Sequence, residues 1–497
     1  LEIPHFKRLL ADLSSHWQLL LYAFPKKFQK FMHLLASHSL QSIFSLACIV
    51  LLSYNIYEVS QLAERLQYLV IADDKQPNTP TSRQPIAWIE GGGPKSLTTH
   101  LRHVVDLFQL MGYNVTSGTV PVEWDVLWTH GYSLMDDRYT DSIRKAKQHQ
   151  IVNHVAGSGF YTSKVWLATS IPMKGIPQSY KLPKQKKEFL AYANQHPHIT
   201  WVQKGNAHRD IQVRELKAMN LDKEDSFIQE FISNPLLIDN RFCAEDYLPF
   251  DSTRLDKYVV GDDYTPIWEI PSLKLSFKEQ KLGWRASLDA YLLSKGMEPT
   301  KVWTQIHHII AEVFRNQQSR MLAAFKSVPS KASFFELSRF DFIVDEDLNV
   351  FLMEANMSPN LSSEHFSQNR ILYEQVLYNV FSLVGIASTK FQGAHLEMLE
   401  EEPSRDFIVP DSEIYVPLTD CIEGGCMECN KPICQLCAQC MNSTMFSTLK
   451  QTCLEHVNRR SMKMLQMNYD KQNPPTMEDH LLQTWRMAKC EMNTSWC

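Results

Sequence analysis

The sequence has few cysteines, little net charge and no glycine-rich phosphate loop of the common type. Nine of its eleven cysteines follow residue 420, so a disulfide framework or a cysteine-ligated zinc site is expected only in the C-terminal region. The formal net charge of −5 over 497 residues is mild and gives no whole-chain case for nucleic-acid binding. The stretch GGGPKS, residues 91–96, lacks the G-x-x-x-x-G-K-[ST] spacing and is interpreted as a turn.

Charge is also absent between Lys30 and Glu58. The centre of this stretch, SIFSLACIVLLSYNIY, is apolar enough for a membrane helix, and we predict a single-pass membrane protein anchored by residues 40–57. A buried helix of a soluble protein is the alternative. Lysines precede the stretch and glutamates follow it, so the positive-inside rule places the N-terminus in the cytosol and the bulk of the chain across the membrane. The long polar segment before it indicates an uncleaved anchor.

The sequence does contain a large apolar fraction, 44%, which suffices for a large core or more than one domain. A linker rich in proline and polar residues, ADDKQPNTPTSRQP, follows the predicted anchor. The predicted regions are an N-terminal polar segment (1–39), the anchor (40–57), the linker (58–85), an α/β domain (86–386) and an acidic linker with a Cys-rich tail (387–497).

The Cys-rich tail contains the run CIEGGCMECNKPICQLCAQC, residues 421–440. Three overlapping C-x-x-C pairs lie in it, a spacing that suggests zinc in a cytosolic tail and disulfides in a luminal one. Histidines are absent from the run. With a predicted anchor upstream, disulfides are the favoured interpretation.

The middle of the chain follows an α/β pattern. PIAWIE (85–90) predicts a short strand, and SLTTHLRHVVDLFQLMGY (96–113) predicts an amphipathic helix with Ser96 as its cap. EWDVLWTHG (123–131) predicts the next strand.

Further along, FFELSRFDFIVDEDLNVFLMEANMSPN (334–360) places polar side chains inside apolar strands. Phe, Ile, Val and Leu lie closely spaced on both sides of DEDL, which predicts a β-hairpin whose loop is Asp345 to Leu348. Asp341, Glu354 and Asn356 lie within the arms of this hairpin.

Strand geometry brings these three side chains to one face. Glu354 and Asn356 are two residues apart and therefore share a face. If the loop holds an even number of residues, Asp341 lies opposite Leu352 and diagonal to Glu354 on that face. Two adjacent carboxylates repel unless they are protonated or bind a cation, and oxygen-only ligation suits Mg²⁺. An amphipathic hairpin with a solvated polar face is the alternative.

Two lysines lie where phosphate-contacting lysines are often found. Lys164 precedes a predicted helix, and Lys204 ends a predicted strand, HITWVQK. Lysines that reach phosphates commonly come from strand ends, although each alone is more typical of a surface lysine. The next strand, SFIQEFISNPLLID, carries Gln229 and Glu230 and either offers backbone groups to a base edge or is merely a core strand.

Together these stretches resemble one family. They are WDVLW (124–128), VNH (152–154) followed by Lys164, WVQK (201–204), QEFIxNPLLI (229–238), RFxxExY (241–247) and the hairpin. Their order and spacing are similar to those of the tubulin–tyrosine ligase-like family, within the ATP-grasp superfamily, over residues 86–386.

The resemblance implies an α/β fold, an ATP-grasp-type ligase domain, here between an N-terminal membrane helix and a Cys-rich C-terminal tail. Asp341, Glu354 and Asn356 fall on positions that hold Mg²⁺ beneath the ATP phosphates in that family. Lys164 and Lys204 fall on its phosphate-contacting lysines and are the implied catalytic residues. The residues on the implied adenine hinge are Gln229, Glu230, Phe231 and Ile232.

The implied chemistry is an amide or isopeptide ligation. A protein carboxylate takes the γ-phosphate of ATP and becomes an acyl phosphate, and the amine of a free amino acid then attacks it. Most members of the family add glutamate to glutamate side chains in tubulin tails, and others add glycine or tyrosine. The implied partners are tubulin or microtubules, free glutamate and the membrane, with ATP and Mg²⁺ as cofactors.

The sequence departs from the family pattern after Asp239. The family continues with K-F-D-x-R and two strands, whereas here Asn240 and Arg241 follow directly. We interpret this junction as an internal deletion because both flanks match and abut; a divergent loop is the alternative. A deletion removes cationic groups and leaves neighbouring strands without pairing partners. Smaller departures are Asp210, where the family has glycine, and KYVVGDDY (257–264), in the region that shapes the amino-acid pocket.

Three functions follow from these observations. The first is an ATP-dependent tubulin glutamylase, which the three oxygen ligands favour. The second is a membrane-anchored pseudoenzyme that keeps the ATP-grasp shell as a binding or scaffold module, which the missing segment favours. The third is a luminal ligase with a non-tubulin acceptor, which the inferred topology favours because tubulin is cytosolic.

Overall fold

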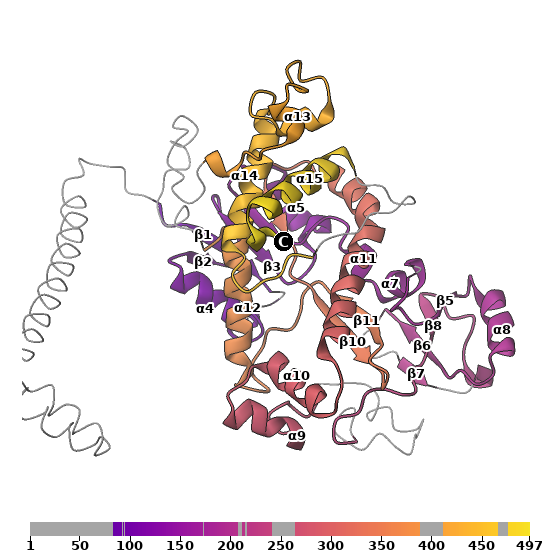
Figure 1. The fold of residues 1–497 in the computed structure, drawn as a ribbon. Helices are drawn as coiled ribbons and strands as arrows, with labels where there is room; N and C mark the ends of the chain where they lie inside the picture. The colour runs from indigo at the N-terminus through magenta and orange to yellow at the C-terminus, as the bar shows by residue number, and fades with distance from the viewer. Residues whose placement is uncertain are drawn as a thin grey trace, which may run out of the picture. The chain divides into compact units, whose positions relative to one another are not determined.

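The computed structural model describes residues 83–465 and 476–497, except residues 92, 94, 172, 207–210, 214–215, 241–263 and 388–410. The chain divides into two units, residues 1–81 and 82–497, and the elements labelled in Figure 1 belong to the second. The predicted N-terminal segment, the predicted anchor and nearly all of the predicted linker lie outside the described residues.

None of the described helices is long and apolar enough to cross a membrane. The longest is α11 (Pro299–Lys326), which carries charged side chains along its length, among them Glu312 and Arg315, and charge is costly inside a bilayer. For the part of the chain that the structure describes, this finding contradicts the predicted localisation as a single-pass membrane protein and the membrane helix of the predicted fold class.

A parallel five-stranded sheet forms the first part of the fold, with the strand order β2-β1-β3-β4-β9. Its strands are β1 (Ile86–Glu90), β2 (Asn114–Thr116), β3 (Val126–Thr129), β4 (Ile151–Asn153) and β9 (Ser333–Phe335). The middle strands are short apolar runs and are almost wholly buried, as expected where a parallel sheet is covered on both faces. The predicted α/β class and the two strands predicted first, β1 and β3, are confirmed.

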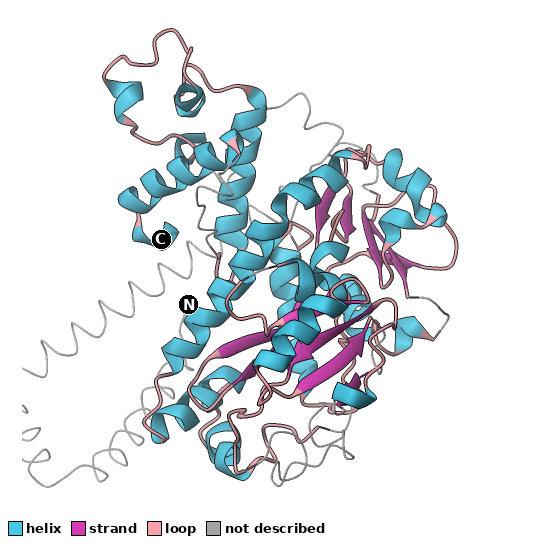
Figure 2. Cartoon of the chain, turned by 90° about the vertical axis from the view of Figure 1, so that its right-hand side faces the viewer, coloured by secondary structure: helices cyan, strands magenta, loops and turns pink. Residues whose placement is uncertain are grey.

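Helices cover both faces of this sheet, as the layers in Figure 2 show. They are α4 (Arg102–Leu110), α12 (Asn369–Leu383) and α5 (Asp137–Arg144). On β1, Ala87 and Ile89 enter the core shared with α4 and α12. Trp88, between them, enters the opposite core, where its ring lies 5.4 Å from that of Tyr139 on α5. The two-residue period of the strand therefore divides one apolar run between two cores.

The helix predicted at residues 96–113 is broken in the structure. A 3₁₀ turn precedes α4, and the Ser96 hydroxyl donates to the Gly93 carbonyl at 2.5 Å. Ser96 therefore does not cap α4, whose N-cap residue is Leu101. Short helical segments before α10 (Trp284–Ser294) are Ser96–Thr98, Ser133–Met135, Leu216–Ala218 and Leu275–Glu279.

An antiparallel four-stranded sheet follows, with the order β5-β8-β6-β7. Its elements are β5 (Ser179–Leu182), β6 (Trp201–Gly205), β7 (Ile211–Val213), β8 (Ser226–Glu230) and the covering helix α8 (Lys186–Gln195). Phe189 of α8 and Trp201 of β6 are buried with ring centroids 5.0 Å apart, so aromatic packing fixes the helix on the sheet.

The predicted hairpin is present as β10 (Arg339–Val344) and β11 (Val350–Asn356), which pair with each other. Figure 1 shows α11 running alongside it. The other helices of this core are α6 (Gly159–Thr162), α7 (Lys164–Ser170), α9 (Pro271–Lys274) and α10 (Trp284–Ser294). Phe340 of β10 stacks on Tyr161 of α6 with ring centroids 6.1 Å apart, so one face of the hairpin is held by packing and the other carries its polar residues.

The region predicted as a Cys-rich tail is folded. Its elements are the 3₁₀ turn Asp411–Glu413, α13 (Thr419–Ile422), the 3₁₀ turn Pro432–Leu436, α14 (Ser443–Asn458), α15 (Met477–Met492) and the 3₁₀ turn Thr494–Trp496. Leu449 of α14 and Trp485 of α15 are fully buried in a shared core. Gln318 of α11 donates to Asp479 of α15 at 2.7 Å, so the C-terminal region contacts the helix that runs alongside the hairpin.

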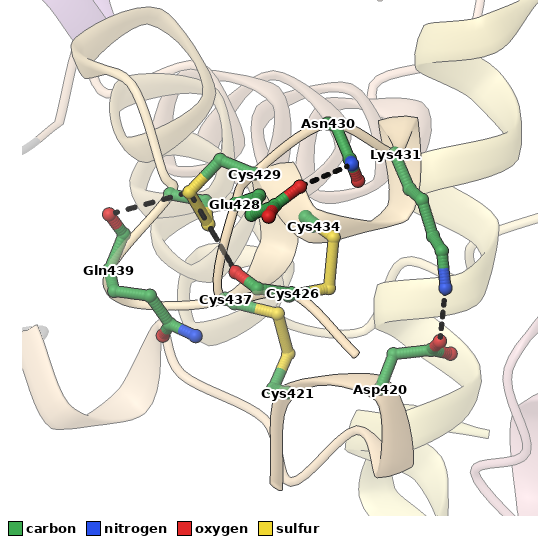
Figure 3. The surroundings of a disulfide bond; sticks show 11 residues. Asp420, Cys421, Cys426, Glu428, Cys429, Asn430, Lys431, Cys434, Cys437 and Gln439 are labelled. Atoms are coloured by element: carbon green, nitrogen blue, oxygen red, sulfur yellow. Dashed lines mark hydrogen bonds and ion pairs between the residues drawn. A yellow bond between two sulfur atoms is a disulfide. The ribbon is translucent and has the colours of Figure 1, made fainter. Parts of the chain in front are cut away.

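Disulfides connect most of the cysteines of this region in the structure. Figure 3 shows Cys421 bonded to Cys437 and Cys426 bonded to Cys434. The remaining bonds are Cys429–Cys440 and Cys490–Cys497. The two cysteines of each C-x-x-C pair therefore belong to different disulfides. The interpretation favoured from the sequence, that this run forms disulfides, is confirmed.

Candidate active site

The register of the hairpin decides where the predicted metal ligands lie, and it differs from the predicted one. The loop holds residues 345–349, an odd number, and Val344 pairs with Val350. Continued regularly, this register would place Asp341 opposite Met353 and leave Glu354 on the other face. A β-bulge between the pairs Phe342–Leu352 and Asp341–Glu354 shifts the register by one residue.

The bulge is what brings the carboxylates together. With Met353 as the extra residue, Asp341 lies directly opposite Glu354, where the prediction placed it opposite Leu352. Asn356 donates to Glu354 Oε1 at 3.1 Å and approaches Asp341 Oδ2 at 3.4 Å. The three predicted ligands therefore share one face, as expected, but through a direct cross-strand pair.

The two predicted lysines converge on the same place. Lys164, the first residue of α7, puts its Nζ 2.7 Å from Glu354 Oε2, and its side chain is 14% exposed. Lys204, on β6, donates to the Gln229 side chain on β8 at 2.8 Å. Lys204 also interacts electrostatically with Lys164 and Glu354, so residues from α7, the four-stranded sheet and the hairpin form one cluster.

A local polar network fixes the start of α7. The Ser163 side chain caps the helix by accepting from the Trp166 N–H. The Ser163 hydroxyl and the Val165 N–H both donate to the Asn206 side chain, at 3.1 and 3.3 Å. Asn206 directly follows the end of β6, so Lys164 and Lys204 are positioned by the same short segment.

The predicted adenine hinge lies at the end of β8. Gln229 is buried and also donates to Ser179 at 3.1 Å. The Glu230 N–H donates to the Gln178 carbonyl and the Phe231 N–H to the Thr200 carbonyl, both at 2.9 Å. These two N–H groups are therefore engaged within the protein. Ile232 follows them directly, and its role in binding a base stays a prediction.

Burial and neighbouring charges shift the ionisation of this cluster. Burial lowers the pKa of Lys204 to about 8, with a further lowering by Lys164 and an opposing contribution from Glu354. Burial by itself would raise the pKa of Glu354, but hydrogen bonds from Lys164, Asn356 and Asp341 hold it at about 2. Burial also raises the pKa of Asp341, against the effect of Arg339.

The donor set fits a hard divalent cation. Two carboxylates and an amide oxygen on one face are ligands of the kind that Mg²⁺ takes, with the remaining positions left to water and phosphates. The carboxylates face each other directly, and the pKa of Asp341 is raised first by burial and then by the neighbouring Glu354 carboxylate. In the described part of the chain, no three His, Cys, Asp or Glu side chains gather as a metal site, so this set depends on Asn356.

Arg339 is a residue of this cluster that the sequence analysis missed. It pairs across the hairpin with Asn356 and forms a bidentate ion pair with Asp341 at 2.8 and 2.9 Å. The signal was available, because a residue two positions before Asp341 on a strand lies on the same face.

Other predicted features lie outside the described residues. They are Asp210, the RFxxExY stretch and all of KYVVGDDY except Tyr264. The junction itself is described, and Asp239 and Asn240 both have positive φ angles, 54° and 62°. Two consecutive left-handed residues without glycine are uncommon, even though Asn and Asp tolerate this conformation best.

Known proteins resemble this chain in the region of the site and beyond. A family model described as "Tubulin-tyrosine ligase family" matches residues 141–241 and 240–392. The chain is 44% identical over 466 residues to "Probable tubulin polyglutamylase ttll-15" of Caenorhabditis elegans, with 87% of this chain and 89% of that protein covered. It is 23% identical over 319 residues to "Probable tubulin polyglutamylase TTLL2" of Homo sapiens, with 54% and 52% covered. For "Tubulin polyglutamylase ttll6" of Danio rerio the identity is 21% over 323 residues, with 56% and 40% covered.

The mixed α/β fold with its parallel sheet is consistent with a ligase domain of the ATP-grasp type. The chain belongs to the tubulin-tyrosine ligase family, and by family it is a ligase. The family resemblance inferred from the motifs is therefore confirmed, including its polyglutamylase-type character.

Proposed function

We propose that this chain is an ATP-dependent ligase that joins free glutamate to carboxylates of tubulin through an acyl phosphate. The acceptor carboxylate oxygen attacks the γ-phosphorus of ATP and ADP leaves. The glutamate nitrogen then attacks the acyl carbon, phosphate leaves, and the nitrogen loses a proton. The proposal is carried by one observation: Asp341 and Glu354 face each other beside Asn356, with Lys164 in contact and Lys204 nearby.

The residues of the cluster have distinct roles in this proposal. Asp341, Glu354 and Asn356 hold Mg²⁺, which neutralises charge on the phosphates and so assists their transfer. Lys164 and Lys204 bind phosphate oxygens from the side of α7 and β6. Lys204 is partly buried, so solvent screens its charge less than it would at the surface. Gln229 fixes the Lys204 ammonium through their 2.8 Å hydrogen bond.

The test is Glu354→Gln. This substitution keeps the shape of the side chain and removes one charge from the metal set. Mn²⁺ binding by the chain, and glutamate incorporation into tubulin by a chain with the missing segment restored between Asp239 and Arg241, should therefore fall by at least about tenfold while the fold survives. Mn²⁺ binding is measured by electron paramagnetic resonance and incorporation with radiolabelled glutamate. The matched control is Glu346→Gln, the same change in the exposed loop of the same hairpin. Unchanged Mn²⁺ affinity in E354Q would sink the metal assignment.

A second candidate is a binding module of the same family without ligase activity. Three observations support an internal deletion at the junction. The family model matches in two segments that meet at residues 240–241. The alignment with the C. elegans relative spans 466 positions, more than 87% of 497 residues, so that relative carries residues that this chain lacks. Asp239 and Asn240 both adopt left-handed backbone conformations.

The hairpin shows what a deletion would take away. Within the described residues β10 pairs with β11 alone. The chain that follows β8 forms backbone hydrogen bonds with the turn end of the hairpin, where Leu236 donates to the Val344 carbonyl at 2.7 Å and Glu346 donates to the Asn234 carbonyl at 3.0 Å. Two further strands at this edge would continue that contact along β10. Their loss favours a weakened or inactive site.

A further inference from the structure

Arg339 occupies the corner of a square of four side chains on one face of the hairpin. It pairs across the strands with Asn356, and the adjacent pair is Asp341 with Glu354. The guanidinium donates from Nε to Asp341 Oδ1 at 2.8 Å and from Nη2 to Asp341 Oδ2 at 2.9 Å. Nη2 also lies 3.7 Å from Glu354 Oε1. The Arg339 guanidinium therefore binds the same Asp341 oxygens that are assigned to the metal.

Neighbouring groups reach all four oxygens of the carboxylate pair. Arg339 holds both oxygens of Asp341, Lys164 lies 2.7 Å from Glu354 Oε2, and Asn356 donates to Glu354 Oε1 at 3.1 Å. A divalent cation needs the lone pairs of these same oxygens. The fork takes one lone pair on each oxygen of Asp341, and its positive charge repels a divalent cation bound to the same carboxylate. Arg339 and a divalent cation therefore compete for Asp341.

Arg339 is also free to leave. Its side chain is 48% exposed, compared with 14% for Lys164, so it can swing away without disturbing the packed face of the hairpin. A planar guanidinium binds a phosphate with the same two-pronged geometry as a carboxylate. When a cation takes Asp341, the phosphates that accompany it are the nearest group of the right shape and charge.

We propose that Arg339 is an exchange cation of this site. Before nucleotide binds, it neutralises Asp341 and relieves the repulsion between the two carboxylates. When the divalent cation arrives with a nucleoside triphosphate, it displaces Arg339 from Asp341, and the guanidinium moves to the phosphates. This inference rests on the proposed function, because it requires a cation and a phosphate at the hairpin.

The first measurement uses the metal alone, on the full chain. Arg339→Gln should tighten Mn²⁺ binding roughly three- to fivefold, the range expected when a partly exposed ion pair stops competing. Without metal, the same variant should melt at a lower temperature, because Asp341 and Glu354 then repel each other. The matched control is Arg138→Gln, since Arg138 forms the same fork with Asp136 two residues away, and it should leave Mn²⁺ affinity unchanged.

The second measurement uses Mg²⁺ with a non-hydrolysable ATP analogue, titrated by calorimetry. Arg339→Gln should weaken this binding roughly tenfold, because a charge-assisted contact to phosphate is lost. Arg339→Lys keeps the charge without the two-pronged geometry, so its affinity for the analogue should lie between those of wild type and Arg339→Gln. The opposite signs of the two effects are the signature of exchange, and a purely structural arginine produces neither.

Each outcome decides the inference. Equal affinities of wild type and R339Q for both ligands, or weaker Mn²⁺ binding in R339Q, overturn it. If Mn²⁺ binds to R339Q and not to wild type, the inference stands and Arg339 blocks the site of the chain as it exists. If neither binds Mn²⁺, the inference fails. If E354Q still abolishes Mn²⁺ binding while R339Q changes nothing, the proposed function survives and only the exchange is wrong.

Discussion

At the scale of single residues, Lys204 shows how the site sets charge against burial. Its ammonium is held by Gln229 and lies close to a second lysine, Lys164. Burial and this like charge lower its pKa from 10.5 to about 8, so the folded chain is destabilised whenever Lys204 carries a proton. A polyanion such as a nucleotide would offset that penalty, which gives this partly buried lysine a role in the site.

We expect this lysine to make stability depend on pH in the alkaline range. The folded pKa lies below the unfolded one, so the unfolded chain holds the proton to higher pH and stability rises as pH increases from about 8 towards 10.5. Below about pH 8 the full penalty remains, at most about 3 kcal/mol. The melting temperature of Lys204→Met minus that of wild type should therefore fall as pH is raised across this window.

The control for this titration is Lys186→Met. Lys186 pairs with the exposed carboxylate of Asp222 at 2.7 Å, so its removal should shift the melting temperature by a small amount that hardly changes over the same window. A flat difference curve for Lys204→Met would show that Lys204 is not the group responsible.

At the scale of elements, the hairpin depends on one bulge. Its packed face is set by residues such as Phe340 and Leu352, which lie in the core beneath α11. Its polar face carries the site. A bulge changes the pairing by one residue. The loop has an odd number of residues, and the bulge returns Glu354 to the face that carries Asp341. The site is therefore a consequence of strand irregularity as much as of residue identity.

The cystine region is the second element whose connectivity can be tested. Peptide mapping of unreduced protein should find Cys421 linked to Cys437, Cys426 to Cys434 and Cys429 to Cys440. Cys426 and Cys434 are both fully buried. Replacing both with serine should lower the free energy of unfolding by about 2–4 kcal/mol, measured by chemical denaturation.

The matched control is the replacement of both Cys490 and Cys497 with serine. The disulfide between these two cysteines closes a short loop at the end of the described chain. Their loss should destabilise the fold less, because Cys497 is exposed whereas Cys426 and Cys434 are fully buried. The disulfide assignment would be contradicted if elemental analysis found bound zinc and if the cysteines of the unreduced protein could be alkylated.

At the scale of the whole molecule, we expect the junction at Asp239 and Asn240 to limit activity. The chain as given should show little glutamate incorporation into tubulin, because charge neutralisation and orientation supply most of the catalysis in phosphoryl transfer. Inserting the corresponding strand pair of the C. elegans relative between Asp239 and Arg241 should raise both incorporation and melting temperature. Radiolabelled glutamate and thermal melting with and without ATP and Mg²⁺ measure the two effects.

The control for the repair is an insertion of equal length made only of glycine and serine. It restores the spacing without strands or charges, and it should rescue neither property. If the chain as written is as active and as stable as the repaired one, the junction is a natural loop and the deletion interpretation is wrong.

The sequence by itself determined the local elements and the family. The apolar runs that became β1 and β3, the hairpin, the two lysines and the oxygen ligands are all local patterns, set by spacing along the chain. The motifs around Lys204 and Glu354 were specific enough to indicate the tubulin-tyrosine ligase family, which the comparisons show.

Only the tertiary structure decided the register and the pairings. Asp341 faces Glu354 because packing beneath the hairpin favours a bulge at Met353, and the energy that selects it comes from residues distant in sequence. Six cysteines in residues 421–440 allow about fifteen connectivities, and the observed one depends on which sulfur atoms the fold brings within bonding distance. Arg339 lies on the site for the same reason: strand period places it on the face, but the bulge decides which carboxylates share that face with it.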